Sequence, residues 1–196
     1  MLISSLIKEA ALKKRIIVPL LMLFAMNVNA NEWSGNVNFI LGTKYLDTGD
    51  WKPSEEQAAF GVLVDFKQQN WPISIAIDLL GSYDEETALG VKTEFGTAEF
   101  DIGVRKIWEV SGSTIRPFIG GGLAFINGEK KTTNVFSTSI NDDGTGIWLN
   151  GGIYWTLGQH FNLGLQARYS RAEISLAGND IEAGGTVAGI MLGYHW

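Results

Sequence analysis

The sequence predicts an all-β protein, an eight-stranded antiparallel up-and-down transmembrane β-barrel preceded by a cleavable signal peptide. Three observations support this prediction. Segments of about ten residues alternate apolar with small or polar side chains, which is the pattern of a tilted strand that crosses a bilayer. The connections between these segments are alternately long and short, as in barrels with long loops on one side of the membrane. The last segment, Val187–Trp196, reaches the final residue and needs the first strand as a neighbour.

The first thirty residues have the organisation of an export signal. The basic residues Lys13–Arg15 precede an apolar run, Ile16–Phe24, that is too short to span a membrane as a helix. Val28–Ala30 then offers a cleavage site with small side chains. We therefore expect residues 1–30 to be a signal peptide and residues 31–196 to be one outer-membrane β-barrel domain; an N-terminal membrane anchor is the alternative.

Composition excludes several classes of function. The chain of 196 residues has a formal net charge of −6, and the charge becomes more negative once the basic leader is set aside. A nucleic-acid partner would need a basic surface, so none is expected. The chain has no cysteine, which removes disulfides, thiol catalysis and cysteine-bound metals.

Each expected strand has one apolar face. The first four, with residues of that face, are Trp33–Leu46 (Val37, Phe39, Leu41, Tyr45), Gln57–Lys67 (Phe60, Val62, Val64, Phe66), Ile73–Tyr83 (Ile73, Ile75, Ile77, Leu79) and part of Val91–Trp108 (Ala98, Phe100, Ile102, Val104). The other four are Ile115–Ile126 (Ile119, Leu123, Phe125), Ile147–Leu157 (Ile147, Leu149, Ile153, Trp155), Phe161–Glu173 (Phe161, Leu163, Leu165, Tyr169) and Val187–Trp196 (Ala188, Ile190, Leu192, Tyr194, Trp196).

Four of the connections are expected to be polar, largely acidic loops on the extracellular side. They are Asp47–Glu56, the segment that opens at Asp84–Glu86, Asn127–Gly146 and Leu176–Gly185. The other three are short turns for the periplasmic side: Gln68–Pro72, Val110–Thr114 and Gly158–His160.

The composition of the two faces decides which one points inward. A soluble barrel would bury the apolar face and present a water-facing surface rich in Lys, Glu, Gln and Thr. Here the opposite face is instead rich in Gly, Ala, Ser and Asn, with isolated charges of both signs, which suits the narrow lumen of an eight-stranded membrane barrel. We expect a paired charge network in a plugged lumen, made by Lys44, Asp65, Asp78, Glu99, Asp101, Arg105, Arg116 and Arg168.

Three stretches resemble a known family: Arg116–Leu123 (RPFIGGGL), Ala167–Ser170 (ARYS) and the alternation that ends at Leu192–Trp196 (LGYHW). On these the mature chain resembles the small outer-membrane β-barrels of Gram-negative bacteria, such as the OmpA membrane domain and OmpX-like proteins. The resemblance implies a place in the cell outer membrane, in contact with its lipid and lipopolysaccharide. It also implies that the final strand is read by the barrel-assembly machinery, through Ala188, Ile190, Leu192, Tyr194 and Trp196; Trp196 stands where the family most often has Phe.

A lipid A-modifying enzyme is the enzyme hypothesis that the sequence raises. Lipid A deacylases resemble this fold and use a His-x-Ser pair with a nearby carboxylate. Arg168, Tyr169 and Ser170 stand at a similar place, but an arginine cannot act as a general base at neutral pH. His160 and His195 are expected at the opposite end, so we expect no catalytic residues and no enzyme.

Other motifs favour structural explanations. Asp84–Glu86 and Asp142–Gly144 could bind a divalent cation, or are simply solvated, and the second lacks the spacing of an EF-hand. Lys130 and Lys131 could contact lipopolysaccharide phosphates. Gly120–Gly122 precedes no helix and so offers no phosphate site. No cofactor or metal is expected.

The barrel, its loops and the absence of catalytic motifs together predict a non-enzymatic role. The chain should be a monomeric barrel with a structural or surface-interaction role, acting through its extracellular loops. A narrow channel for small solutes is the alternative.

Overall fold

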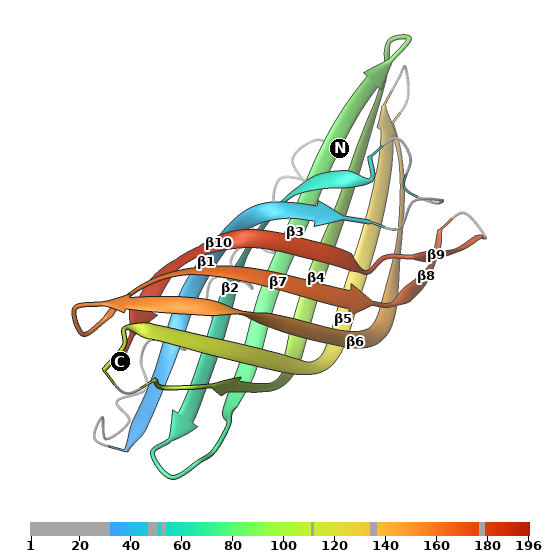
Figure 1. The fold of residues 1–196 in the computed structure, drawn as a ribbon. Coiled ribbons are helices and arrows are strands. Elements are labelled where there is room, and N and C mark those ends of the chain that lie inside the picture. Colours follow the sequence, from blue (N-terminus) through green and yellow to red (C-terminus); the bar gives the residue numbers. More distant parts are fainter. Residues whose placement is uncertain (1–31, 47–50, 52–53, 111, 134–136, 177–178) are drawn as a thin grey trace, which may run out of the picture. The chain divides into compact units, whose positions relative to one another are not determined.

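The computed structural model describes residues 32–46, 51, 54–110, 112–133, 137–176 and 179–196. The expected signal peptide lies outside these residues. Residues 34–196 form one compact unit, a closed β-barrel (Figure 1). Among the described residues, no helix is long and apolar enough to cross a membrane.

Eight strands close the barrel in the order β1-β10-β7-β6-β5-β4-β3-β2. Their bounds are β1 Trp33–Tyr45, β2 Glu56–Gln68, β3 Ser74–Ala88, β4 Val91–Ile107, β5 Ile115–Thr133, β6 Ser137–Leu157, β7 Phe161–Arg171 and β10 Gly185–His195. Two short strands, β8 (Glu173–Leu176) and β9 (Asn179–Glu182), pair with each other between β7 and β10. The predicted fold class is therefore confirmed.

The seam of the barrel joins the first and last strands. β1 and β10 pair antiparallel from Asn36–His195 to Tyr45–Thr186, and Gly42 faces Gly189 in the middle of this register. Beyond the ladder, the amide of Trp196 donates to the carbonyl oxygen of Gly35 at 3.1 Å, and the amide of Gly35 donates to the carbonyl of Trp196 at 3.2 Å. The predicted partnership of the two terminal strands is confirmed.

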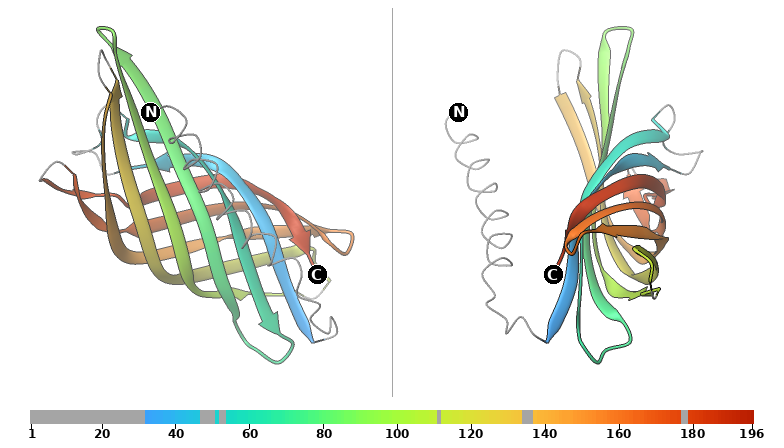
Figure 2. Two further views of the ribbon diagram at one scale, coloured as in Figure 1. Left: turned by 180° about the vertical axis from the view of Figure 1, so that it is seen from behind. Right: turned by 60° about the vertical axis from the view of Figure 1, so that its left-hand side comes forward.

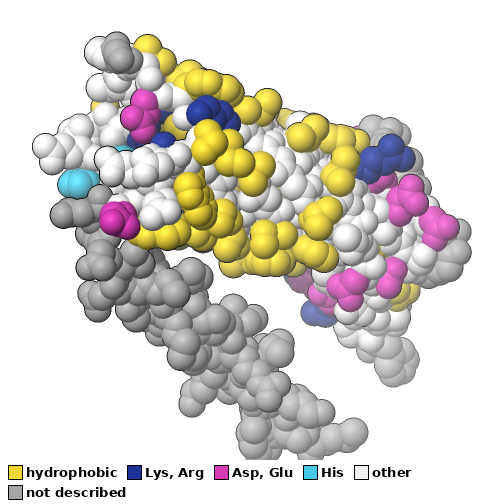
Figure 3. All heavy atoms as spheres, turned by 90° about the horizontal axis from the view of Figure 1, so that it is seen from below, with side chains coloured by type: hydrophobic (Ala, Val, Ile, Leu, Met, Phe, Trp, Pro, Cys, Tyr) yellow, Lys and Arg dark blue, Asp and Glu magenta, His cyan; other side chains and the backbone are white. Residues whose placement is uncertain are grey.

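Side chains alternate between the two faces as the period-two pattern predicts. On β1, Phe39 is 62% exposed, whereas its neighbours Asn38 and Ile40 are buried. Outward apolar residues occur on all eight strands. On the face drawn in Figure 3 they form a band, and the larger group of acidic side chains lies beyond one end of it.

Two hairpins are much longer than the sequence pattern indicated. β5 and β6 have 19 and 21 residues, whereas a tilted strand needs about ten to cross the hydrocarbon core. The prediction of a loop over Asn127–Gly146 is wrong for most of that segment, which is paired strand. Asn127 pairs with Asp143, and the ladder continues to Thr133 and Ser137. β3 likewise runs through the expected loop residues Asp84–Glu86. Figure 2 shows both hairpins standing beyond the other strands.

The alternation of hydrophobicity could not reveal these extensions. Beyond the apolar band both faces of most residues are at least partly exposed (Phe95 is a buried exception), so a strand there needs no alternation of apolar side chains, while backbone pairing continues. We call this part of the molecule the extended sheet: residues 83–96 of β3 and β4, and the β5 and β6 residues from 127 to 133 and from 137 to 143. We call its end of the barrel the long-hairpin end and the other the short-turn end.

A strained turn closes the β3–β4 hairpin. Ala88 pairs with Val91, and the two residues between them, Leu89 and Gly90, have φ values of 51° and 79°. Two-residue hairpin turns with two positive φ values favour Asn-Gly, whereas leucine is disfavoured in this left-handed region. Leu89 is nevertheless there, and it is fully exposed.

Candidate functional site: the charged lumen and the extended sheet

All eight residues expected to form the lumen network lie inside the barrel and are at least nine-tenths buried. They come from β1 (Lys44), β2 (Asp65), β3 (Asp78), β4 (Glu99, Asp101 and Arg105), β5 (Arg116) and β7 (Arg168).

Arg168 is the centre of the network. Its Nη1 donates to Asp78 Oδ2 at 3.0 Å, and its Nη2 donates to Glu99 Oε1 at 3.3 Å and to Asp101 Oδ2. The guanidinium also lies over the Trp148 ring, 4.4 Å from its centroid. A planar guanidinium can do both, because it donates in its plane and stacks through its face.

Arg105 joins the second half of the network. It donates to Asp65 Oδ2 at 3.2 Å and to Asp78 Oδ2 at 2.8 Å, so that Asp78 links the two arginines. Its guanidinium carbon lies 5.6 Å from the centroid of Phe118. Asp65 also accepts a hydrogen bond from Asn36 at 2.7 Å.

Lys44 binds the network at its edge. Its Nζ donates to Thr97 Oγ1 at 2.9 Å and to the carbonyl of Ala183 at 3.2 Å, and it lies 3.7 Å from Glu99 Oε2. Arg116, by contrast, does not join the other seven residues. It contacts Thr156 at 3.3 Å and Glu109, an exposed residue after β4, at 3.7 Å.

Two apolar clusters accompany these charges. One contains Phe118 with Tyr154 stacked on it at 4.5 Å, together with Ile40, Leu63, Val187 and Met191. The other contains Trp148 and is joined by Trp51, from the connection between β1 and β2, with Phe95, Ile126 and Ile174. Arg105 therefore stacks on a ring of the first cluster and Arg168 on a ring of the second.

The position of Trp51 is a feature that the sequence did not reveal. Its side chain is buried, its ring meets Phe95 edge-on at 6.3 Å, and its Nε1 donates to the carbonyl of Glu182 at 2.7 Å. Trp51 thus ties the first connection to β9. A tryptophan within an acidic, otherwise polar segment was the available signal.

The residues weighed for catalysis do not come together. Ser170 is buried and donates to Glu99 Oε2 at 3.1 Å. The two histidines lie at the short-turn end, where His160 Nδ1 is 2.8 Å from the carbonyl of His195 and the His160 ring stacks on Tyr194. The described partner of Ser170 is therefore a carboxylate and not an imidazole.

The residues weighed for cation binding are occupied within the protein. Asp142 Oδ2 accepts from the Ser175 amide at 2.6 Å, and Asp143 Oδ1 accepts from Asn127 at 2.9 Å. Within the described ranges, no group of three or more His, Asp or Glu side chains is arranged to hold a metal ion.

The five residues expected to form the assembly signal all point outward on β10 or at its end. Their side chains are exposed: Ala188, Ile190, Leu192, Tyr194 and Trp196. Tyr194 and Trp196 lie at the short-turn end, where Tyr194 pairs with Val37 and Phe161.

An ionic cluster lies on the outer face of the extended sheet. Lys92 bridges Glu85 (2.9 Å) and Glu94 (3.2 Å), Lys131 contacts Glu94 at 3.3 Å, and the Tyr83 hydroxyl donates to Glu85 at 2.7 Å and to Glu94 at 3.1 Å. The hydrogen bonds to Glu85 and Glu94 raise the pKa of Tyr83 to about 12. The same contacts lower the pKa of both carboxyls, chiefly through Tyr83 for Glu85 and through Lys92 for Glu94, and raise the pKa of Lys92.

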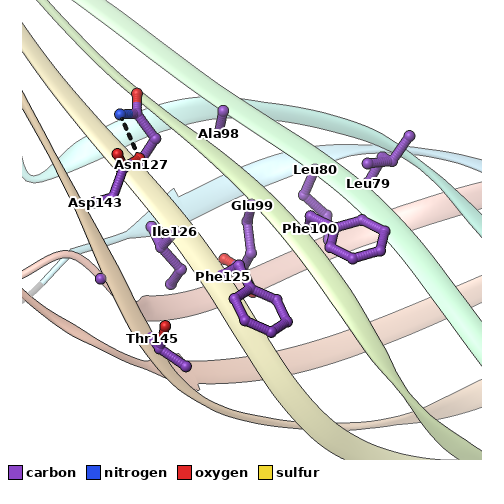
Figure 4. Close-up of a pocket in the computed structure, with 11 residues that line it drawn as sticks. Leu79, Leu80, Ala98, Glu99, Phe100, Phe125, Ile126, Asn127, Asp143 and Thr145 are labelled. Carbon is purple, nitrogen blue, oxygen red and sulfur yellow. Dashed lines mark hydrogen bonds between the residues drawn. The ribbon is translucent and has the colours of Figure 1, made fainter. Parts of the chain in front are cut away.

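A hollow of about 500 Å³ lies where the extended sheet joins the apolar band (Figure 4). Ala98 and Asn127 are among its lining residues, and so are Leu79, Phe100 and Phe125 of the band. The Phe100 and Phe125 rings stack at 6.0 Å. The outer face thus changes from aromatic to ionic within a few residues of each strand.

Comparison with known proteins agrees with this geometry. The family model described as the outer membrane protein beta-barrel domain matches residues 16–195. The chain belongs to this outer membrane β-barrel family. The protein is accordingly an outer-membrane barrel, and the predicted family and location are confirmed. Compared by sequence, no curated protein matches it.

Solved structures of the family share the fold at low sequence identity. Ail, the attachment invasion locus protein of Yersinia pestis, crystallised with the heparin analogue sucrose octasulfate, is 13% identical with a TM-score of 0.61; the match covers 84% of this chain and 99% of Ail. OprG from Pseudomonas aeruginosa is 13% identical with a TM-score of 0.56, over 84% and 96% of the two chains. Neisserial surface protein A is 10% identical with a TM-score of 0.52, over 83% and 94%.

Proposed function

We propose that this outer-membrane barrel acts at the cell surface through its extended sheet, with a closed lumen and no enzymatic activity. The observation that carries the proposal is the tip of the β3–β4 hairpin. There a fully exposed leucine, Leu89, occupies a backbone conformation that costs a non-glycine residue about 1–2 kcal/mol. An apolar side chain held at the end of a long hairpin is suited to contact a partner surface.

The orientation follows from the lengths of the connections. Outer-membrane barrels have short periplasmic turns and long extracellular elements. The extended sheet therefore faces the cell exterior in our proposal, and the chain ends on the periplasmic side.

Closure of the lumen is supported by its side chains. An eight-stranded barrel is just wide enough for its side chains to fill. Here two arginines span between carboxylates, and an apolar cluster including Trp51 lies beside them. A narrow channel remains the alternative role that planar-bilayer recording separates from this one.

Lipopolysaccharide is the proposed lipid partner of the outer face. Lys92 and Lys131 face outward beyond Phe100 and Phe125, where phosphate groups of the outer leaflet would meet the barrel. Both amines are about half exposed and could exchange a carboxylate for a phosphate.

Adhesion tests the proposed surface role. Cells expressing the protein should adhere to polystyrene, a hydrophobic probe surface, more than cells without it, and Leu89→Asn should remove the difference while improving the turn. Val110→Asn is the matched control, because it replaces an exposed apolar side chain near a short turn, and it should leave adhesion unchanged. Equal adhesion of the wild type and Leu89→Asn would contradict the proposal.

Nanodiscs test the proposed lipid partner. Lipopolysaccharide in the nanodisc should increase the thermal stability of the wild type relative to phospholipid alone. Lys92→Gln with Lys131→Gln should reduce that gain, whereas Lys67→Gln with Lys106→Gln, at the short-turn end, should not.

A further inference from the structure

The buried charges of the lumen do not balance. The connected network contains four carboxyl groups, Asp65, Asp78, Glu99 and Asp101, and three cationic groups, Lys44, Arg105 and Arg168. Each of the seven is at least 96% buried. With every group ionised, the network would hold one negative charge in excess.

The other buried cation among the described residues, Arg116, does not correct this excess. Arg116 has its own carboxylate, Glu109, and is not bonded to the seven residues. The network lies among aromatic rings and aliphatic side chains, where an uncompensated charge is far more costly than in water. A buried carboxyl in this position is more stable when neutral.

Two buried carboxylate oxygens without hydrogen-bond partners in the described part of the chain indicate which residues carry the excess negative charge. Asp78 accepts both arginines through Oδ2, and Asp101 accepts Arg168 through Oδ2. The Oδ1 atoms of both residues are buried and have no hydrogen-bond partner among the residues that the structure describes. Asp78 and Asp101 face each other across the β3–β4 ladder, so their Cβ atoms are about 5 Å apart.

Asp101 lies close to two other acids of the network, Asp78 and Glu99. It faces Asp78 across the ladder, and it accepts from the same nitrogen of Arg168, Nη2, as Glu99 does. On its other side the register places Ala124, which brings no charge. The buried titratable or charged groups of the surrounding strands are Lys44 on β1, Asp65 on β2, Asp78 on β3, Glu99 and Arg105 on β4, Arg116 on β5, Tyr154 on β6 and Arg168 on β7. On β10 the half-buried His195 contacts Asn36 at the short-turn end.

We propose that the lumen network binds one proton at neutral pH and that Asp101 holds it. A protonated Asp101 removes the excess charge and gains an O–H group that donates to a neighbouring carboxylate oxygen of Asp78 or Glu99. The proton comes from water, and no other bond is made or broken. Neighbouring carboxyl groups that outnumber their cations favour sharing a proton, as in a carboxyl pair that holds one proton between two acids.

Infrared spectroscopy of the purified barrel in detergent tests this proposal directly. At pH 7 the wild type should show the C=O stretch of a neutral carboxylic acid, shifted to lower frequency in D₂O. Asp101→Asn should abolish the band and keep the fold, because an amide resembles a protonated carboxyl in shape and charge. Retained heat-modifiable gel mobility would show that the fold is intact.

A matched control separates this site from acids in general. Glu109→Gln removes a carboxyl outside the network and should leave the band unchanged. A wild-type spectrum with no such band at pH 7 would overturn the proposal, including the case in which a metal cation supplies the missing charge. A band that survives in Asp101→Asn and disappears in Glu99→Gln would overturn the assignment to Asp101.

Discussion

Arg168 and Asp78 stand on diametrically opposite strands of the barrel, and Nη1 of one lies 3.0 Å from Oδ2 of the other. β7 and β3 are separated by three strands in one direction and three in the other. The contact therefore crosses the full width of the lumen.

Removing this cross-link should destabilise the barrel strongly. Arg168→Met leaves Asp78, Glu99 and Asp101 buried without their shared donor, and breaking a buried ion pair on one side costs about 3–5 kcal/mol. The free energy of unfolding in urea, followed by tryptophan fluorescence in lipid vesicles, measures the loss. Arg171→Met, on an exposed arginine of the same strand, should change it by less than about 1 kcal/mol.

The same contact should block ion flow. In planar bilayers the wild type should give no reproducible unitary conductance if, as we propose, the arginines and their partners close the lumen. Arg105→Ala combined with Arg168→Ala removes both and should produce discrete current steps. Steps of the same size from the wild type would favour the channel role instead.

The limits of the apolar band can be mapped with arginine. Ile102→Arg places a charge on the lipid-facing side of β4 and should cost about 2–4 kcal/mol near the bilayer midplane. Ser139→Arg, at an exposed site that pairs with Lys131 on the outer face of the extended sheet, should be close to neutral. Similar losses at both sites would mean that the membrane covers the extended sheet.

Acid should loosen the tip of the β3–β4 hairpin. Glu85 and Glu94 have pKa values lowered below those of the unfolded chain, so their contribution is present above the ordinary glutamate pKa and is lost as pH falls through the lowered values. Lys92, with a raised pKa, contributes at all pH values below the ordinary lysine pKa and loses its contribution only in strong alkali. Amide exchange of residues 84–94, corrected for the intrinsic pH dependence, should therefore rise in acid and remain low at neutral pH.

Lipid A should be unchanged by the protein. Mass spectrometry of lipid A from cells with and without expression should give the same acyl pattern, because Ser170 is bonded to Glu99 and the histidines lie at the other end. An altered pattern that disappears in Ser170→Ala would establish an enzyme.

The barrel could be predicted because the lipid and the lumen impose opposite requirements on successive residues. On β1, for example, the apolar Phe39 points outward and the charged Lys44 points into the lumen. Alternation with a period of two therefore identified the strands. The extensions from Asn127 and Asp84 could not be predicted, because paired strands in water need no such alternation. The burial of Trp51, and the choice of partner for each lumen charge, depend on contacts between segments far apart in sequence, which no local pattern contains.

The lumen network also bears on the order of folding. Its seven ionisable residues come from β1, β2, β3, β4 and β7, and the link from Arg168 to Asp78 can form only after the sheet has curled until opposite strands meet. In a half-curled sheet Arg105 can already meet Asp78 on the neighbouring strand, whereas Arg168 is still hydrated and apart from its carboxylates. We therefore expect the burial of Arg168 to accompany the closing of the β1–β10 seam.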